Sequence, residues 1–272
     1  MAKRIWGITL ISCLLLVGCG GRSSSSGDGA SNYTIGGSTS VQPLMEHMSE
    51  KYNEVTGTRV SVQGGGSSVG TKGTIDGTFD VGMVSRELKD DEIGKLDTTI
   101  IAFDGIVVII NKENPVMDVS LDEVKKIFIG EITNWKEVGG EDKEIAVVSR
   151  EEGSGTRDGF ESIVGFETTS LVNNADIQNA TGSIISAVSG NKQAIGYISL
   201  GSISNQIKLV SIEGVQASEE TIKEGSYQLR RPFTLCLKKD SEEAKTLFDF
   251  IFSDEGEAII KEYNYIPVER FE

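Results

Sequence analysis

Three predicted strands in this sequence end in a short turn of Gly, Ser and Thr residues that opens a helix. The turns lie at 37–40 (GSTS), 66–68 (GSS) and 153–156 (GSGT). Strand–turn–helix units repeated along one chain indicate an α/β fold with mainly parallel sheets. The amino end of a helix presents unpaired N–H groups and about half a positive charge, and Gly lets a ligand approach the backbone closely. If the three turns converge, they form a cage for a small anion that is built largely from neutral dipoles.

The rest of the chain continues the alternation of strands and helices. Apolar, mostly β-branched residues at 105–110 predict a strand buried on both faces. Apolar residues at helical spacing predict a helix that begins near Leu121. Gly57 is expected to end the first helix, and Ser241 to cap the last one. The length of 272 residues allows one large domain or two lobes.

The amino terminus carries a predicted secretion signal. Lys3 and Arg4 precede an apolar run at 5–17 that is too short to span a bilayer, which needs about 20 apolar residues. The run ends in LVGC, which resembles the lipobox of bacterial lipoproteins and implies cleavage before Cys19 and a lipid on its thiol. The alternative is an ordinary signal peptide with an incidental Cys. We therefore expect a signal peptide at 1–18, a Gly/Ser tether at 19–32, and an outward-facing protein anchored to the cell membrane.

Charge and cysteine content exclude several classes of partner. The formal net charge is −15, and removal of the signal would take away two positive charges. Such acidity argues against nucleic acid and anionic lipid as ligands. A bound anion must then be held by local geometry. Of the three cysteines, Cys13 lies in the signal and Cys236 lies in the apolar stretch FTLCL, so we expect no disulfide framework and a buried thiol at Cys236.

Two motifs of enzyme chemistry are present only in part. GGGSSVGTKGT is similar to a P-loop, but Thr71 stands before Lys72, and the residue directly after Lys72 is Gly73 and not Ser or Thr. GSSVG matches a nucleophile elbow, which needs a His late in the chain, whereas the single His, His47, lies upstream in the first helix. One His and one free Cys do not make a zinc site. We therefore expect no catalytic residues, no metal and no cofactor.

Five segments of the sequence together resemble one family. GSTSVQPL, QGGGSSVG, DVGMVSREL, ITNW and VVSREEGSGTRDGF resemble PstS-type phosphate-binding proteins of ABC importers, and most closely their short lipoprotein branch from Gram-positive and related bacteria. The resemblance covers residues 33–272. It implies the two-lobed periplasmic-binding-protein fold of type II, with inorganic phosphate captured in a cleft between lobes that close on it. It also implies a monomer that delivers phosphate to the membrane subunits of an ABC permease.

In this family the chain crosses twice between the lobes, and we place the crossings near 103–106 and 229–233, next to long apolar strands. Lobe one would then be 33–104 with 232–272, and lobe two 105–231.

The resemblance also implies which residues hold the ligand: Thr39, Ser40, Ser67, Ser85, Arg150, Ser154, Gly155 and Thr156. Arg150 would supply the full positive charge, with paired donors that suit an oxyanion. Glu152 is expected to hold Arg150 in place, and Ser38 to support the site. Arg86 either faces the cleft or is a solvated charge.

One position departs from the longer family members. They carry an Asp that accepts the proton of hydrogen phosphate and thereby rejects sulfate, and Ser85 takes its place here. An acceptor would then come from Glu152 or from a backbone carbonyl. The same fold binding sulfate or another tetrahedral oxyanion is therefore an alternative. A surface hydrolase and an adhesin are further alternatives from other classes.

Overall fold

A computed structural model describes residues 32–239 and 244–268. The expected signal peptide, Cys19 and the tether lie outside these residues, as does Ser241. Eight strands follow one another across a continuous curled sheet in the order β2-β1-β3-β11-β4-β8-β6-β7. Their bounds are β1 Asn32–Gly37, β2 Arg59–Gly64, β3 Val81–Val84, β4 Leu96–Asn111, β6 Ala146–Arg150, β7 Asp176–Gln178, β8 Ala194–Ser199 and β11 Arg230–Lys238. Within the described ranges, no helix is both long and apolar enough to cross a membrane.

Shorter strands and the helices complete the fold. Strands β9 (Ile207–Leu209) and β12 (Ile266–Pro267) pair with β4, and β5 (Asp118–Val119) pairs with β10 (Ser211–Ile212). The helices are α1 Gln42–Thr56, α2 Ser67–Asp76, α3 Leu121–Phe128, α4 Gly155–Val164, α5 Thr181–Gly190, α6 Glu219–Glu224, α7 Lys245–Ile251 and α8 Asp254–Glu262. Short 3-10 turns lie at Trp135–Val138, Thr168–Ser170 and Leu200–Ser202.

Local sequence signals explain several of these boundaries. Helix α1 ends at Gly57, whose φ of 74° lies in the left-handed region. Helix α3 begins at Leu121 behind a capping box, in which Ser120 and Glu123 each accept a hydrogen bond from the other's backbone N–H. Both boundaries confirm the sequence prediction. The expected last helix is two helices, because the hydroxyl of Ser253 caps a new start at α8.

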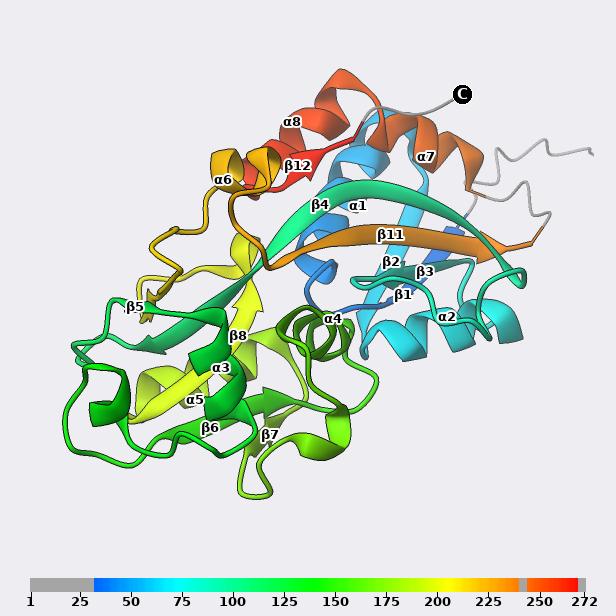
Figure 1. The fold of residues 1–272 in the computed structure, drawn as a ribbon. Helices are drawn as coiled ribbons and strands as arrows, with labels where there is room; N and C mark the ends of the chain where they lie inside the picture. Colours follow the sequence, from blue (N-terminus) through cyan, green and yellow to red (C-terminus); the bar gives the residue numbers. More distant parts are fainter. Residues whose placement is uncertain (1–31, 240–243, 269–272) are drawn as a thin grey trace, which may run out of the picture.

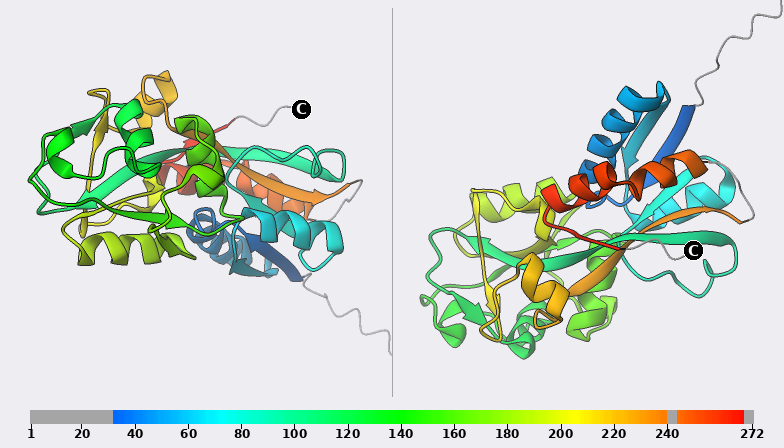
Figure 2. Two further views of the ribbon diagram at one scale, coloured as in Figure 1. Left: turned by 60° about the horizontal axis from the view of Figure 1, so that its bottom comes forward. Right: turned by 90° about the horizontal axis from the view of Figure 1, so that it is seen from above.

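Two large hydrophobic cores lie along the described part of the sheet, and a small third cluster comprises Val84, Leu96 and Cys236. The first core takes its buried residues from 35–102 and 233–265, and the second from 106–229 with Ile266. Strands β4 and β11 run side by side as an antiparallel pair, and β4 extends from one core into the other (Figure 1). The change of core falls between Ala102 and Ile106 on β4. Figure 2 shows the two parts from further sides, and we call them the first and second halves after their cores.

The outer strands of each half pair in parallel, as the sequence predicts. Strand β1 lies parallel to β2 and β3, and β6 lies parallel to β7 and β8. The two long strands run antiparallel to their neighbours in the sheet. Helices that follow the carboxyl ends of parallel strands start at the same edge of a sheet, which is where ligands bind in open α/β folds. Strands β1, β2, β6 and β7 therefore place the starts of α1, α2, α4 and α5 at facing edges of the two halves.

Candidate functional site

The three predicted turns meet between the two halves. The hydroxyl oxygens of Ser40, before α1, and Thr156, in the first turn of α4, lie 2.8 Å apart. The backbone N–H of Ser68, in the first turn of α2, donates to the carbonyl of Gly153, with a separation of 3.1 Å. Two turns of the first half thus contact the one turn of the second half.

Gly155 shows how closely the turns approach. A Cβ atom at this position would lie 2.1 Å from the hydroxyl oxygen of Ser67 and 2.7 Å from that of Ser85. Ser67 accepts a hydrogen bond from the backbone N–H of Ser85 at 3.0 Å. Only Gly leaves room here for the start of α4 to reach the hydroxyls of the first half.

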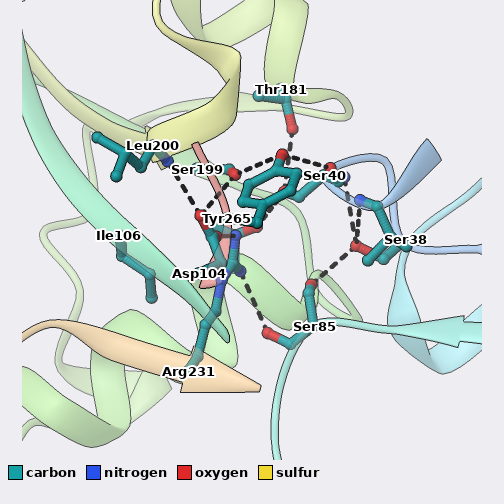
Figure 3. Close-up of polar contacts among 12 residues, drawn as sticks. Ser38, Ser40, Ser85, Asp104, Ile106, Thr181, Ser199, Leu200, Arg231 and Tyr265 are labelled. Atoms are coloured by element: carbon teal, nitrogen blue, oxygen red, sulfur yellow. Dashed lines mark hydrogen bonds and ion pairs between the residues drawn. The ribbon is translucent and has the colours of Figure 1, made fainter. Parts of the chain in front are cut away.

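Ser38 organises the turn before α1. Its hydroxyl donates to Ser85 Oγ at 2.8 Å and accepts from the backbone N–H of Ser40 and of Val41 (Figure 3). Helix α1 itself begins two residues after Ser40. At the opposite turn, Ser154 is the N-cap of α4 and accepts from the backbone N–H of Arg157. Ser38 therefore orders, through hydrogen bonds, the hydroxyl cluster formed by Thr39, Ser40, Ser67, Ser85 and Thr156.

Arg150 ends strand β6 and is almost fully buried, with 1% of its surface exposed. Its Nη2 donates to Thr39 Oγ1 at 3.0 Å. Its Nε and Nη2 bind the carboxylate of Glu151 at 2.8 and 2.9 Å. The expectation that Glu152 holds Arg150 is wrong. The backbone N–H of Glu151 donates to the carbonyl of Gln178, which keeps Glu151 beside β7, whereas Glu152 is exposed in the turn.

Thr181 belongs to the cluster although the sequence analysis did not select it. It begins α5, and its hydroxyl lies 3.3 Å from that of Ser40 and 3.4 Å from that of Thr39. Arg150 Nη1 also donates to it at 3.4 Å. The signal was available, since residues 180–183 read ATGS before a helical pattern, a fourth small-residue helix start after a strand.

Arg86 is neither solvated nor directed at the hydroxyl cluster. It is 3% exposed, and its guanidinium binds the carboxylate of Glu92 through Nη1 and Nη2, both at 2.8 Å. Burial alone would lower the pKa of Arg86, but hydrogen bonds and charge attraction from Glu92 and Asp158 outweigh it and raise the pKa. The guanidinium is therefore a fixed positive charge inside an ion-pair network.

A buried ion pair lies behind the hydroxyl cluster, where the two halves join. Asp104 on β4 and Arg231 on β11 are 0% and 2% exposed, and Arg231 donates to Asp104 through Nε and Nη2 at 2.9 and 2.8 Å. Arg231 also donates to the backbone carbonyl of Ser85 (Figure 3). Burial raises the pKa of Asp104 and lowers that of Arg231, and the attraction between the two groups opposes both shifts.

Two further residues tie this pair to both halves. Ser199 at the end of β8 donates to Asp104 at 2.9 Å, and its hydroxyl lies 3.2 Å from that of Tyr265. Tyr265 packs in the first core, and its hydroxyl donates to the carbonyl of Ser40. Hydrogen bonds thus run without a break from the join of the halves to the turn before α1. The long sequence separations hide this network from sequence analysis.

The arrangement is suited to one desolvated oxyanion. The predicted ligand residues meet as hydroxyls, first-turn backbone of helices and one guanidinium, all of which donate hydrogen bonds. Ser40, Ser67, Ser85, Ser154 and Thr156 are all buried. Donors fixed in a low-dielectric place bind an anion more strongly than the same donors in water. The carboxylate nearest to the guanidinium, that of Glu151, is occupied by Arg150.

Comparisons with known proteins bear on the family of this chain. The family model of the PBP superfamily domain matches residues 22–255. A phosphate-binding protein PstS of Staphylococcus aureus strain USA300 is 32% identical over 93% of this chain and 84% of its own length. The PstS of Borreliella burgdorferi is 28% identical over 98% and 99%.

Solved structures show the same fold. A Clostridium perfringens protein described as a phosphate ABC transporter substrate-binding protein, solved with phosphate bound, superposes with a TM-score of 0.86 at 42% identity, covering 88% of this chain and all of that one. An ABC-type phosphate transport receptor from Vibrio cholerae superposes with a TM-score of 0.74 at 37% identity, covering 87% and 100%. The chain has the type II periplasmic-binding-protein fold and belongs to the PstS-type phosphate-binding proteins of the PBP superfamily.

Proposed function

We propose that this protein captures inorganic phosphate outside the cell and delivers it to the membrane subunits of an ABC permease. The observation that carries the proposal is the meeting of four helix starts around Arg150, which brings hydroxyl, amide and guanidinium donors to one place. The ligand residues would be those that the sequence analysis named, together with Thr181. Charge-assisted hydrogen bonds in a closed cleft would then hold the anion without making or breaking a bond.

We infer that the two cores correspond to two lobes that close on the ligand. Lobe one would comprise 33–104 and 232–272, and lobe two 105–231. The positions at which the cores change support these bounds, because they fall on β4 and next to β11. Closure about two adjacent strands would bring the starts of α1 and α2 against those of α4 and α5.

Arg150→Ala tests the proposed function directly. We expect phosphate affinity to fall at least about a hundredfold, because a buried guanidinium with paired donors would be the main charge partner of the anion. Arg59→Ala removes the same charge from an exposed position on β2 and should leave affinity within about twofold. Isothermal calorimetry gives the affinities, and circular dichroism checks that both variants stay folded. Unchanged affinity of Arg150→Ala would refute the assignment.

Sulfate is the second candidate ligand, and Ser85 is the observation that favours it. Its hydroxyl accepts from Ser38, so its own proton is available as a donor, and a donor does not repel a fully deprotonated dianion. Calorimetric titration with phosphate and then sulfate at two pH values separates the candidates. Tight phosphate binding with negligible sulfate binding means that an acceptor exists in the site, whereas comparable binding of both means that Ser85 has removed the discrimination.

Location and anchoring follow the same proposal. A protein that serves an importer works on the outer side of the membrane. A lipid on Cys19 with a Gly/Ser tether at 19–32 would keep the protein there, and we expect it to be a monomer. Metabolic labelling with a radioactive fatty acid should mark the protein, and Cys19→Ser should abolish the label. A labelled Cys19→Ser variant would contradict the anchor.

A hydrolase is the alternative from a different class. The single His of the chain is His47. Its Nδ1 lies 4.0 Å from Glu262 Oε2 and its ring contacts that of Tyr263, so these contacts do not reach the serines of the cluster. Without a base beside a serine, phosphoester turnover has no activated nucleophile. A turnover assay with p-nitrophenyl phosphate should give no rate above that of buffer.

A further inference from the structure

We propose that Asp158 is a latch residue, which holds the two halves together across the site and so sets how fast bound phosphate leaves. The inference rests on the proposed function. It concerns a residue outside the predicted ligand set, located in the first turn of α4. Its partners are Arg86 and Lys89, which follow β3 in the first half.

The first-half side of the latch is preassembled. Arg86 is held by Glu92 through two hydrogen bonds of 2.8 Å, and Glu92 also accepts from the hydroxyl of Thr71 at 2.6 Å. Thr71 lies on α2, so this network is attached to the helix whose start contributes Ser67. Arg86 would therefore keep its position and one carboxylate partner whether or not the second half is nearby.

Asp158 completes the network from the other side. Its Oδ2 lies 2.9 Å from Arg86 Nε and 3.3 Å from Lys89 Nζ. Arg86 Nε and Asp158 Oδ2 are both buried, and neither makes an aligned hydrogen bond within 32–239 and 244–268. Arg86 Nε therefore relies on its ion pair with Asp158 for compensation of its burial, and Asp158 Oδ2 relies on its ion pairs with Arg86 and Lys89.

The pair joins elements that belong to different cores. Helix α4 packs Phe160 and Val164 in the second core, whereas Arg86 follows Met83 of the first core. Separation of the halves would return Asp158 to water and leave Arg86 with Glu92. Loss of the Asp158 charge would thus destabilise the closed arrangement and leave the open one unchanged. The apparent affinity for phosphate would fall by the same factor as the equilibrium constant for closure.

The latch also lies next to the site that it would close. Arg86 Nη2 donates to the hydroxyl of Ser68 at 3.3 Å, and the N–H of Ser68 donates to Gly153 in the turn before α4. One guanidinium therefore connects the start of α2 with Asp158 on α4. Opening at this point would separate the hydroxyls of Ser67 and Ser85 from Gly155.

Asp158→Asn tests the latch, with Asp122→Asn as the matched control. Asp122 pairs with Lys126 within α3, so the control removes the same charge without touching the contact between halves. We expect phosphate to dissociate about tenfold faster from Asp158→Asn, with an association rate within about twofold of the original protein. The control should change neither rate by more than about twofold. Release of radiolabelled phosphate into excess unlabelled phosphate gives the dissociation rate.

Lys89→Met refines the test, because Lys89 is half exposed and forms its ion pair, within 32–239 and 244–268, with Asp158. We expect about twofold faster dissociation from Lys89→Met and no further change when it is combined with Asp158→Asn. The melting temperature of the phosphate-free protein should be the same for Asp158→Asn and Asp122→Asn.

An unchanged dissociation rate in Asp158→Asn would overturn the latch. So would a lower melting temperature of phosphate-free Asp158→Asn than of the control, because Asp158 would then stabilise one half and not its contact with the other. If the unsubstituted protein binds no phosphate, the proposed function fails and the latch fails with it. That result differs from one in which the protein binds phosphate and the substitution has no effect.

Discussion

Glu92→Gln should lower the unfolding free energy of the ligand-free protein at neutral pH. Burial alone would raise the pKa of the Glu92 carboxyl, but hydrogen bonds from Arg86, Thr71 and the N–H of Lys89 outweigh it and hold the pKa at about 2, below the ordinary 4.5. One pKa unit corresponds to about 1.4 kcal/mol. The gap therefore favours the ionised form by about 3.5 kcal/mol at most, and solvent screening puts the expected cost at about 1.5–3 kcal/mol.

The pH dependence gives the sharper test of the same prediction. Because the folded protein lowers the pKa, the stabilisation is present in full above about pH 4.5 and is lost as the pH falls toward 2. The difference in unfolding free energy between the original protein and Glu92→Gln should therefore shrink steadily between pH 5 and pH 3. Gln resembles the protonated acid, so the two proteins should become equal once Glu92 is protonated.

Urea unfolding followed by tryptophan fluorescence measures this difference at each pH. The protein must be freed of phosphate first, since a ligand that binds only the folded state adds its own stabilisation. Glu113→Gln is the control, because Glu113 pairs with Lys192 on the surface, where both side chains are more than half exposed, and should cost less than about 1 kcal/mol. A cost for Glu92→Gln no larger than the control, or one that does not change with pH, would refute the reasoning.

Three further substitutions test the site and its support. Asp104→Ala leaves the Arg231 charge buried and unpaired, and should cost about 3–5 kcal/mol in urea unfolding, far more than a surface carboxylate. Gly155→Ala places a methyl group against Ser67, and calorimetry should show phosphate affinity at least about a hundredfold lower, while the melting temperature of the phosphate-free protein stays the same. Thr181→Val keeps the side-chain shape but removes the hydroxyl, and should weaken phosphate binding by about three- to tenfold, whereas unchanged affinity would remove Thr181 from the site.

The sequence was sufficient for features that depend on short-range chemistry. Gly57 ends α1 because its left-handed conformation is local, and Leu121 begins α3 because Ser120 and Glu123 cap each other within four residues. The three Gly/Ser/Thr turns could be recognised for the same reason. Their convergence could be stated only as a condition, since it depends on how parallel strands order themselves in the sheet.

Features that depend on packing across the chain were missed or misplaced. The partner of Arg150 is Glu151 and not Glu152, a choice made by the hydrogen bond between Glu151 and Gln178 of β7. The pairing of Asp104 with Arg231 joins residues 127 positions apart. Strand β4 begins at Leu96, well before the expected 105, because residues 97–100 are exposed or half-buried and are held in the sheet by pairing with β11. No local pattern identifies such partners.

The path of the chain through the two cores also has a consequence for the order in which a chain emerging from its amino end would assemble. The second core is nearly continuous in sequence, from Ile106 to Leu229, whereas the first core is complete only when residues 233–265 are present. Strand β11 separates β3 from β4 in the sheet, so β1, β2 and β3 gain their inner neighbour only when about the last sixth of the chain arrives. Contacts between residues so distant in sequence form slowly. A chain that emerges from its amino end would therefore complete the first half, with the turns at 37–40 and 66–68, only after nearly all of it has emerged.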